Sequence, residues 1–522
     1  MDVRKYPATY AETKPDAKAV IAAETGEFIT WRELDERSNQ LAHYLHELGL
    51  RRGDRVAVFL ENNIRIYEIV WAVLRSGLYL TTVNRYLTAE EAGYIVDDCD
   101  AKVAISSMAL ADVAVDIPSH APSCQSWLML DGVSGTYQSY EAAVAPFPTH
   151  SLEQEPAGWF MLYSSGTTGR PKGILRPLLD QDVGTEGTYP IVALMEGFWN
   201  FTERSVYLSP APLYHSAPLA FSAGTLALGG TVVFMQKWDP EAALRFIETY
   251  QITHSQWVPT MFSRMLKLPE TVRTQHDLSS HQVAIHAAAP CPKQVKEAMF
   301  EWWGPMIYEY YAGTELNGLT HVGPDAWLSH PGTVGQAVLG TIHICDESGV
   351  ELATGETGLV YFEQDEMPFS YHKDDDKTKD AQHPTFSNWS ALGDVGYVDG
   401  EGYLYLTDRA SFMIISGGVN IYPQEIEDVM VMHPKVGDVA VIGVPNVDMG
   451  EEVKAIAELA PGIVGDAALE AELLGFAREK LAHYKCPKSV DFTDALPRLP
   501  TGKLYKRILK DQYWGKEGSR IV

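Results

Sequence analysis

The sequence predicts an α/β protein, in which a large N-terminal domain of α/β subdomains plus a small β-rich subdomain precedes a small α+β C-terminal domain. Up to about residue 330, apolar strand-like runs alternate with helical stretches, which is typical of βαβ units around a mostly parallel sheet. After about Pro331 short strand-like pieces lie between Gly, Asp and Glu turns, and near Arg409 the pattern changes again. We therefore expect domains over 1–408 and 409–522, with the β-rich subdomain at about 331–408.

The first predicted helix begins at a capping box, because Thr30 is followed by Glu33, and Gly49 ends it. Its leucines share one helical face: Leu34, Leu41, Leu45 and Leu48. Further helices are expected at 66–77 and 241–250, and strands at 54–60, 78–83, 102–106, 231–235 and 281–289. The β-rich pieces are 341–346, 357–363 and 402–408, and the α+β tail comprises 425–434, 436–445 and 469–481.

The segment from Ser205 to Met235 contains no Asp, Glu, Lys or Arg and is long enough to span a membrane. Prolines and glycines interrupt it, and these residues break a spanning helix. A buried strand, a loop and a core helix tolerate them. We therefore expect protein interior here and no integral membrane segment.

Composition narrows the function classes. The 522 residues include 69 acidic and 41 basic side chains, a formal net charge of -28. This charge repels nucleic acid and anionic membranes unless a basic patch is present, so we expect neither as a partner. Five scattered cysteines without a C-x-x-C pair, together with an N-terminus that has no apolar h-region, indicate a cytoplasmic protein. A homodimer is an open alternative for its assembly.

The segment YSSGTTGRPKG, residues 163–173, has the composition of a phosphate-binding loop. Its glycines let backbone N–H groups approach an anion, its hydroxyls donate hydrogen bonds, and its lysine adds charge. The residues expected to bind phosphate are Ser164, Ser165, Gly166, Thr167, Thr168 and Lys172. Only two residues separate Gly166 from Gly169, so the spacing is not that of a Walker P-loop. A flexible surface turn is the alternative.

Four further motifs follow this loop in order: YYAGTE (310–315), LGDVGYVDGEGYLYLTDR (392–409), ISGGVNIYPQEIE (415–427) and LPRLPTGKLYKR (496–507). Together the five motifs resemble the adenylate-forming superfamily, specifically its acyl-CoA synthetases and aryl-CoA ligases. The resemblance covers essentially the whole chain. It implies an N-terminal AMP-binding domain, a mobile C-terminal lid domain, and ATP, Mg²⁺ and coenzyme A as cofactors.

The resemblance assigns nucleotide contacts to three of these motifs. Tyr311 would stack on the purine, and Asp394 would bind the ribose hydroxyls. Arg409 would reach ribose or phosphate, and Thr314 would hold an α-phosphate oxygen. The implied magnesium ligands are Thr168 and Glu315. Without the resemblance, the same residues would fit a tyrosine-rich strand end in a core and a surface ion pair.

The C-terminal motifs carry the two reaction steps in this resemblance. Lys503 would stabilise the charge that builds during adenylation, and Gly417 and Gly418 would let the pantetheine thiol approach the acyl carbonyl. The implied catalytic residues are Lys503, Thr314, Glu315 and His215. At the hinge, relatives commonly have Asp, Lys or Gln two positions after the equivalent of Arg409, whereas this chain has Ser411.

Small, apolar and aromatic residues would line the acyl pocket. The implied pocket residues are His215, Ala288, Ala289, Ala312, Gly313 and Asn317. His215 stands where amino-acid-activating relatives have an aspartate for the α-ammonium group, and a histidine cannot replace that charge. We therefore expect a hydrophobic acid of the fatty, aryl or steroid side-chain type, with the three classes left open.

The implied reaction converts the acid with ATP to an acyl-AMP, releasing pyrophosphate, and then forms the acyl-CoA thioester with release of AMP. Two alternatives remain. An acyl-AMP ligase could load a discrete carrier protein. A non-enzymatic reading is an inactive nucleotide-binding sensor, which fits poorly with the presence of Lys503, Glu315 and both glycines.

Overall fold

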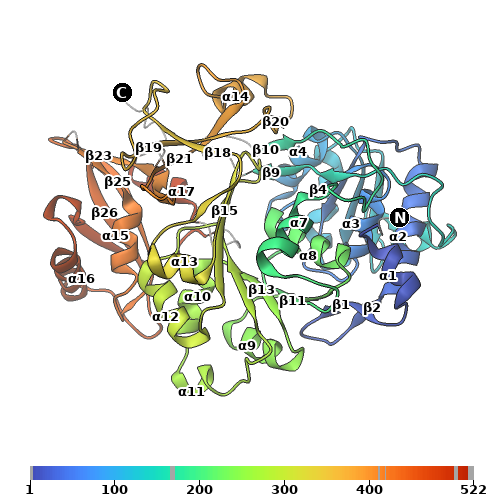
Figure 1. Ribbon diagram of the computed structural model, residues 1–522, viewed down its shortest axis with the longest axis horizontal. Coiled ribbons are helices and arrows are strands. Elements are labelled where there is room, and N and C mark those ends of the chain that lie inside the picture. Colours follow the sequence, from blue (N-terminus) through green and yellow to red (C-terminus); the bar gives the residue numbers. More distant parts are fainter. Residues whose placement is uncertain (1–3, 165–170, 410–411, 418, 499–503, 515–522) are drawn as a thin grey trace. The chain divides into compact units, whose positions relative to one another are not determined.

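The computed structural model describes residues 4–164, 171–409, 412–417, 419–498 and 504–514. They divide into two compact units, which are coloured along the sequence in Figure 1. Unit 1 comprises Met1–Trp257, Lys267–Ile285 and Pro368–Thr378, and unit 2 comprises Val258–Leu266, His286–Met367 and Lys379–Val522. The fold is mixed α/β with a large N-terminal and a small C-terminal domain, which confirms the predicted fold class. The boundary at 408/409 stays a prediction.

Two sheets of mainly parallel strands form the centre of unit 1. One has the strand order β7-β6-β5-β3-β4-β8, with every pair parallel. Its strands are β3 (Arg55–Phe59), β4 (Tyr79–Thr82), β5 (Ala101–Ser107), β6 (Ser126–Leu130), β7 (Gln138–Ser139) and β8 (Trp159–Phe160). In the other sheet β1, β11, β12 and β13 pair in parallel, while β2 is antiparallel to β1. Its strands are β1 (Lys18–Ala22), β2 (Phe28–Thr30), β11 (Val206–Ser209), β12 (Thr231–Phe234), β13 (His254–Trp257) and β14 (Val283–His286).

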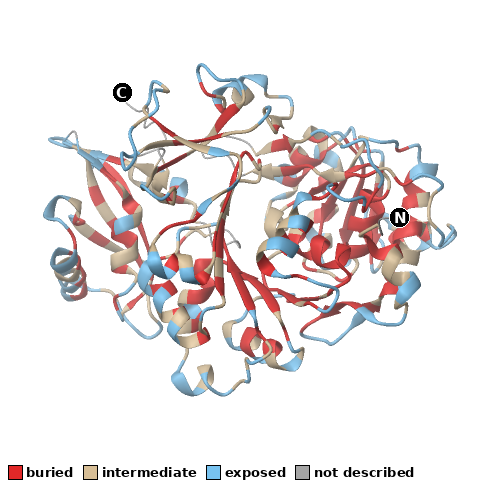
Figure 2. Ribbon diagram, viewed as in Figure 1, coloured by how far each residue is buried: buried red, intermediate tan, exposed pale blue. Residues whose placement is uncertain are grey.

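Helices and a small third sheet complete unit 1. The sheet is antiparallel, with β20 (Ser370–Tyr371), β10 (Lys172–Leu175) and β9 (Leu162–Ser164) in that order. The helices are α1 (Pro7–Thr13), α2 (Trp31–Glu47), α3 (Ile66–Leu74), α4 (Ala89–Asp98), α5 (Ala111–Ala114), α6 (Tyr140–Val144), α7 (Pro190–Trp199), α8 (Ser216–Ala227), α9 (Pro240–Thr249) and α11 (Glu270–Arg273), while α14 (Asp375–Asp380) begins here. Figure 2 shows burial concentrated in the strands, as expected for parallel strands covered by helices.

Helix α2 shows how well the predicted capping box and leucine face agree with the structure. The Thr30 side chain accepts from the Glu33 N–H while the Glu33 carboxylate accepts from the Thr30 N–H, so the predicted capping box is confirmed. Leu34, Leu41 and Leu45 are buried. Leu48 is the C-cap residue after Glu47, and Gly49 follows with φ +85°, as expected of the residue that ends the helix. Unlike the other three leucines, Leu48 is 45% exposed.

The uncharged segment 205–235 lies in the interior, as predicted. It forms β11, α8 and β12, and nine of the twelve residues of α8 are buried. Its prolines stand before the helix or in its first turn, where they cost no intrahelical hydrogen bond. Within the described ranges, the helices are too short or too polar to cross a lipid bilayer.

Unit 2 contains the predicted β-rich region. Its antiparallel sheet has the order β18-β19-β21-β22, with β18 (Thr341–Cys345), β19 (Gly358–Glu363), β21 (Trp389–Val398) and β22 (Leu404–Arg409). A second antiparallel group is β15 (Ile307–Ala312), β16 (Leu319–Val322) and β17 (Gln336–Leu339). The helices of this part are α10 (Pro259–Leu266), α12 (Lys293–Trp303) and α13 (Pro324–Ser329).

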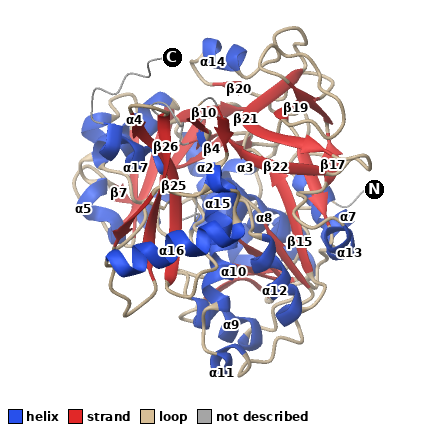
Figure 3. Ribbon diagram, turned by 90° about the vertical axis from the view of Figure 1, so that its left-hand side faces the viewer, coloured by secondary structure: helices blue, strands red, loops and turns tan. Residues whose placement is uncertain are grey.

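The C-terminal sheet of unit 2 is covered on both faces. It comprises β23 (Ile414–Ser416), β24 (Val419–Ile421), β25 (Val436–Asn446), β26 (Gly450–Leu459) and β27 (Ser489–Thr493). Successive strand residues point to opposite faces. Val439 and Val441 therefore pack with α15 (Pro423–Met430) and α16 (Ala467–Lys480), whereas Ala440 and Ile442 pack with α17 (Lys506–Trp514). Figure 1 shows α16 and α17 on opposite sides of the sheet, and Figure 3 shows α15 and α16 on its near side.

A buried ion-pair network ties helices of unit 1 together. Arg75, whose side chain is 2% exposed, donates from Nε to Glu155 Oε1 at 2.7 Å and from Nη1 to Asp35 Oδ1 at 2.9 Å. Tyr6 donates its hydroxyl proton to the other oxygen of Glu155 at 3.1 Å. Charges this deeply buried are stabilising only as a complete set.

We expect Glu155→Gln to lower the free energy of unfolding by about 1–3 kcal/mol, because it keeps the shape but removes the charge that faces Arg75. Urea or thermal unfolding would measure the change. The control is Asp16→Asn, which breaks an exposed pair with Arg32 and should change little. Equal midpoints for Glu155→Gln and wild type would contradict this role.

Candidate active site

One carboxylate joins three segments of unit 2. The register of β21 and β22 places Asp394 opposite Arg409, and Arg409 Nε lies 3.0 Å from Asp394 Oδ1. Tyr311 on β15 donates its hydroxyl proton to Asp394 Oδ2 at 2.6 Å. Asp394 is only 7% exposed, so its charge depends on these two partners.

The environment of Tyr311 keeps its phenol protonated. Burial and the negative charge of Asp394 raise the pKa of Tyr311 well above its ordinary value. The ring is therefore a neutral group fixed through its hydroxyl, with an aromatic face that can pack against a planar ligand. Next to it stands a guanidinium that stays charged at any physiological pH.

These residues line a cavity of about 330 Å³ within unit 2. Seven of the residues singled out from the sequence contribute to its wall, namely Ala288, Ala289, Tyr311, Ala312, Gly313, Asp394 and Arg409. They come from the segment before α12, from β15 and from the β21–β22 pair. The structure thus brings together predicted residues from distant parts of the sequence.

Other predicted residues of unit 2 lie beside this cavity without lining it. Glu315 is 7% exposed, and Asn317 donates its side-chain N–H to the Ser390 carbonyl at 3.1 Å. Thr314 stands between Gly313 and Glu315 on the same turn. A Cβ at Gly313 would lie 2.1 Å from Leu392 Cδ1 and 3.0 Å from Glu315 Oε2, so a larger residue there would have to displace the ends of these side chains.

Magnesium was expected at Thr168 and Glu315. Thr168 lies outside the described residues, whereas Glu315 offers a carboxylate, the hard oxygen ligand that Mg²⁺ prefers. Among the described residues no group of three or more His, Cys, Asp or Glu could hold a metal ion. By itself, the Glu315 carboxylate fits a magnesium ion that takes its other oxygens from a bound phosphate, which is how this ion usually binds.

In unit 1 the structure fixes the two ends of the expected phosphate loop. Ser164 at the end of β9 pairs with Lys172 at the start of β10. Lys172 Nζ lies 3.2 Å from Asp374 Oδ2, a partner that the sequence did not suggest. The other expected loop residues, Ser165, Gly166, Thr167 and Thr168, lie outside the described residues, as do Lys503, Gly418 and the hinge residue Ser411.

His215, also in unit 1, is the N-cap residue of α8. Its backbone N–H bonds to the Pro212 carbonyl at 3.2 Å, and its ring lies 4.2 Å from the Tyr214 ring, centroid to centroid. It is partly exposed at the N-terminus of α8, most of whose residues are apolar and buried.

Gly417 occupies the turn between β23 and β24 with φ +57°, a conformation that favours glycine. Large apolar side chains are exposed around this turn: Ile415, Val419, Val447 and Met449. Apolar residues gathered on an otherwise polar surface mark a binding face. We call these four residues the Gly417 face.

The cavity of unit 2 has a charged wall that the sequence did not indicate. Lys506, within the basic run KLYKR, is 3% exposed and lies 2.8 Å from Glu427. Burial raises the pKa of the adjacent Asp428 to about 7, with further contributions from Glu427 and Asp408, while Lys506 and a hydrogen bond from Gln424 oppose the shift. No signal local to the sequence distinguishes these side chains from surface charges.

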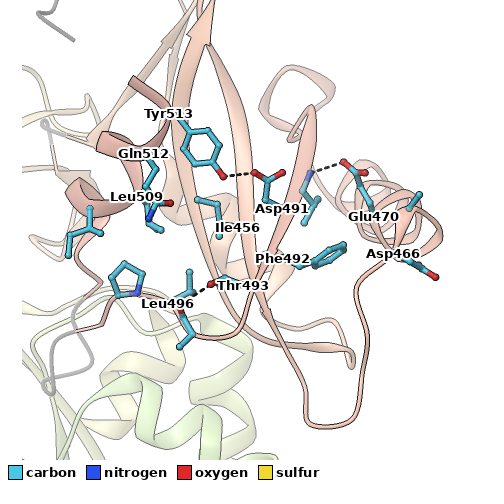
Figure 4. A pocket seen from close by; sticks show the side chains of 15 residues that line it. Ile456, Asp466, Glu470, Asp491, Phe492, Thr493, Leu496, Leu509, Gln512 and Tyr513 are labelled. Atoms are coloured by element: carbon cyan, nitrogen blue, oxygen red, sulfur yellow. Dashed lines mark hydrogen bonds between the residues drawn. The ribbon is translucent and has the colours of Figure 1, made fainter. Parts of the chain in front are cut away.

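A second cavity, of about 860 Å³, surrounds the edge strand β27 (Figure 4). The carboxylates that line it are engaged in contacts within the domain. Asp491 accepts from the Tyr513 hydroxyl and pairs with Lys454, Glu470 accepts from the Val490 N–H, and Asp466 caps α16. This arrangement covers part of the outer edge of β27, and we assign it a structural role.

Two family models match the chain. Residues 8–371 match the model described as AMP-binding enzyme, and residues 425–503 match the model described as AMP-binding enzyme C-terminal domain. The first match alone covers more than half of the chain.

Individual proteins are similar along nearly the whole length. The chain is 30% identical over 519 residues to the long-chain-fatty-acid–CoA ligase FadD13 of Mycobacterium tuberculosis, with 96% of this chain and 97% of that protein covered. It is 28% identical over 522 residues to the fatty acid–[acyl-carrier-protein] ligase ScoC of Streptomyces coeruleorubidus, covering 98% and 96%. Against the crystal structure of ATP-bound MatB from Rhodopseudomonas palustris the TM-score is 0.81, at 28% identity and with 99% and 100% of the two chains covered.

The raised pKa of Asp428 predicts a pH-dependent stability. The folded protein holds this proton more tightly than the unfolded chain does, so the contribution is complete below about pH 4 and is lost as the pH rises through about 7. We expect Asp428→Asn to raise the free energy of unfolding by about 1–3 kcal/mol at pH 8 and by nothing measurable at pH 4. Thermal unfolding across this range would measure it.

The matched control is Asp448→Asn, which neutralises an exposed aspartate of the same domain. It should leave the difference from wild type flat across the pH range. A stabilisation by Asp428→Asn that is as large at pH 4 as at pH 8 would show that the charge is not the cause.

Proposed function

The chain belongs to the AMP-binding enzyme family, and from this membership we propose that it is an acid–thiol ligase that joins a hydrophobic carboxylic acid to coenzyme A at the expense of ATP. One observation carries the proposal for the site. Residues predicted separately to bind nucleotide and acid, among them Tyr311, Asp394 and Ala288, line a single cavity. Its volume suits part of a nucleotide or an acyl group.

In the first step the acid's carboxylate oxygen attacks the α-phosphorus of ATP, giving acyl-AMP and pyrophosphate. The Tyr311 ring would pack on adenine, Asp394 would accept from the ribose hydroxyls, and Arg409 would hold a ribose or phosphate oxygen. Bound Mg²⁺ would neutralise phosphate charge next to Glu315. The Lys172 side chain, held at the start of β10, would bind the β- and γ-phosphates with the loop that precedes it.

In the second step the thiol sulfur of coenzyme A attacks the acyl carbon, and AMP leaves with the bonding electrons. The Gly417 face supports this assignment, because it combines a glycine turn with exposed apolar residues. Such a surface can pack beside the aliphatic pantetheine arm without placing a side chain in its path. No covalent enzyme intermediate is needed, since orientation and charge stabilisation supply the catalysis.

The acid is proposed to be hydrophobic. Ala288, Ala289, Ala312 and Gly313 give one part of the cavity wall small, uncharged side chains, so this part leaves room for an apolar group. His215 would stand near the acid, where a neutral imidazole tolerates an apolar chain but cannot balance the charge of an amino acid. Fatty, aryl and steroid side-chain acids all meet these requirements.

A carrier protein is the alternative acceptor, and the 28% identity to ScoC supports it beside the 30% identity to FadD13 that supports coenzyme A. Both acceptors present the same pantetheine thiol, so the Gly417 face suits either. A cytoplasmic location and assembly as a homodimer complete the proposal. An inactive sensor would need no reactive lysine, and Lys503 is present in the chain.

Lys172→Ala should raise the KM for ATP by about tenfold or more, because a charged contact to phosphate is lost. Pyrophosphate release at varied ATP would measure it. Lys373→Ala is the matched control, since that lysine belongs to the same unit and pairs with Asp100 at 2.8 Å. The assignment is wrong if both variants keep the wild-type KM.

The two proposed steps can be separated. Wild-type protein should release pyrophosphate with ATP and a hydrophobic acid, and should form the thioester once coenzyme A is added. Lys503→Ala should slow acyl-AMP formation by about a hundredfold or more while thioester formation from supplied acyl-AMP stays nearly normal. Gly418→Leu should show the reverse pattern, because a side chain would block the thiol.

Both half-reactions should be measured in both variants. Equal loss of the two steps in each variant would show that the chain does not divide its chemistry between Lys503 and the glycines Gly417 and Gly418. Efficient activation of an α-amino acid by the wild type would refute the hydrophobic substrate.

A further inference from the structure

A completely buried ion pair lies against the cavity of unit 2. Lys296 Nζ on α12 is 2.6 Å from Glu309 Oε2 on β15, and the two side chains are 0% and 6% exposed. Lys296 Nζ also lies 4.8 Å from the centre of the Trp327 ring on α13. Burying two charges is costly, and hydrophobic residues of the same volume would stabilise a core at least as well. The pair therefore calls for a role other than stability.

The pair contacts a third buried group. His286 Nε2 lies 3.4 Å from the same Glu309 oxygen, and the His286 side chain is 0% exposed. Burial and the nearby Lys296 cation lower the pKa of His286 well below its ordinary value, so the imidazole is neutral. On its other side the ring meets Phe262 of α10 edge-on, with 5.5 Å between centroids. His286 is thus held in one place by rigid neighbours.

These three side chains bracket one wall of the cavity. His286 directly precedes Ala287–Pro292, and Lys296 lies in the helix that follows. Ala288, Ala289 and Cys291 of this segment line the cavity, whereas Lys296 does not. Both ends of the segment therefore lie against one carboxylate, that of Glu309, and Lys296 is bonded to it.

Glu309 also connects to the nucleotide contacts. It stands two residues before Tyr311 on β15, so the two side chains leave the strand on the same face. Tyr311 in turn holds Asp394. A shift of Glu309 would move the aromatic ring that we propose to pack on adenine.

The fastened segment contains a strained residue. Ala288 has φ +74°, in the left-handed region that residues with a Cβ seldom adopt. Its exposed position offers no packing of its own that would enforce this conformation. A strained backbone persists only where the surrounding structure over-determines it, and such residues gather at ligand sites.

We propose that Lys296 and Glu309 are positioning residues, whose buried ion pair clamps α12, and with it the preceding segment Ala287–Pro292, to β15 and holds Ala288 as a preformed wall of the nucleotide cavity. The ligand in this statement rests on the proposed function. The clamp itself concerns the protein alone and can be tested without ATP.

Cys291 provides a local probe, because it lies within the segment and is partly exposed while the other four cysteines are buried. We would measure the rate of its alkylation by N-ethylmaleimide in the unliganded full-length protein, with the labelled site assigned by mass spectrometry. The variants are Lys296→Met, which leaves Glu309 unpaired, and Lys296→Met with Glu309→Gln, which removes both charges. The double variant restores neutrality, so it separates loss of the clamp from failure to fold.

We expect the double variant to unfold near the wild-type midpoint, to label Cys291 about tenfold faster or more, and to raise the KM for ATP about tenfold while kcat changes less than about threefold. The control is Glu155→Gln, which weakens a buried ion pair of unit 1 that does not line the cavity. It should lower the unfolding midpoint without changing Cys291 labelling or the KM for ATP.

Two results would overturn the clamp. One is a double variant with wild-type labelling and KM. The other is faster labelling in Glu155→Gln to the same extent, which would reduce the pair to a general stabilising contact. If wild-type protein neither binds nor uses ATP while labelling still responds to Lys296→Met and Glu309→Gln, the clamp stands and the proposed ligand is wrong.

Discussion

The site depends on one buried carboxylate, that of Asp394, which is stable there only with its two hydrogen-bonding partners. Asp394 is nearly buried, and an isolated charge there would cost more than the fold could supply. Its two oxygens are satisfied by Tyr311 and Arg409, so β15, β21 and β22 must keep one register for the charge to be tolerated. Arg409 is also the last residue of β22, next to the proposed hinge. The same contact therefore shapes the cavity and fixes the point from which the C-terminal part of the chain departs.

Paired charges recur around this cavity. Lys506 with Glu427, Arg498 with Asp438 and Arg409 with Asp394 all belong to its wall, and each pair lies mostly out of solvent. A wall of this kind presents polar atoms at fixed places while carrying little net charge. Within a chain of net charge -28, such pairing keeps the general negative field from acting at full strength on an anionic ligand.

The features that the sequence predicted depend on residues close together in the chain, whereas the features it missed depend on contacts between residues far apart in the chain. The capping box at Thr30, the interior position of 205–235, the α/β class and the family follow from local patterns and motif order, and they are confirmed. Leu48 was placed on the same helical face as Leu34, Leu41 and Leu45, because periodicity alone does not show that it is the C-cap residue and lies exposed. The partners of Lys172 and Lys506 were missed, because each depends on a residue far away in sequence. Glu309 lies one residue before the YYAGTE motif, yet only the folded structure shows its buried lysine.

The edge of β27 also affects how the C-terminal domain would behave as a separate fragment. A free edge of a sheet offers unpaired N–H and C=O groups to any other strand, which is a common route to aggregation. Here α16 and α17 flank the last strand, and the carboxylate of Glu470 occupies the Val490 N–H on its outer side. On the β27 side of the sheet, a fragment carrying this domain would therefore present a strand edge that its own side chains already partly engage.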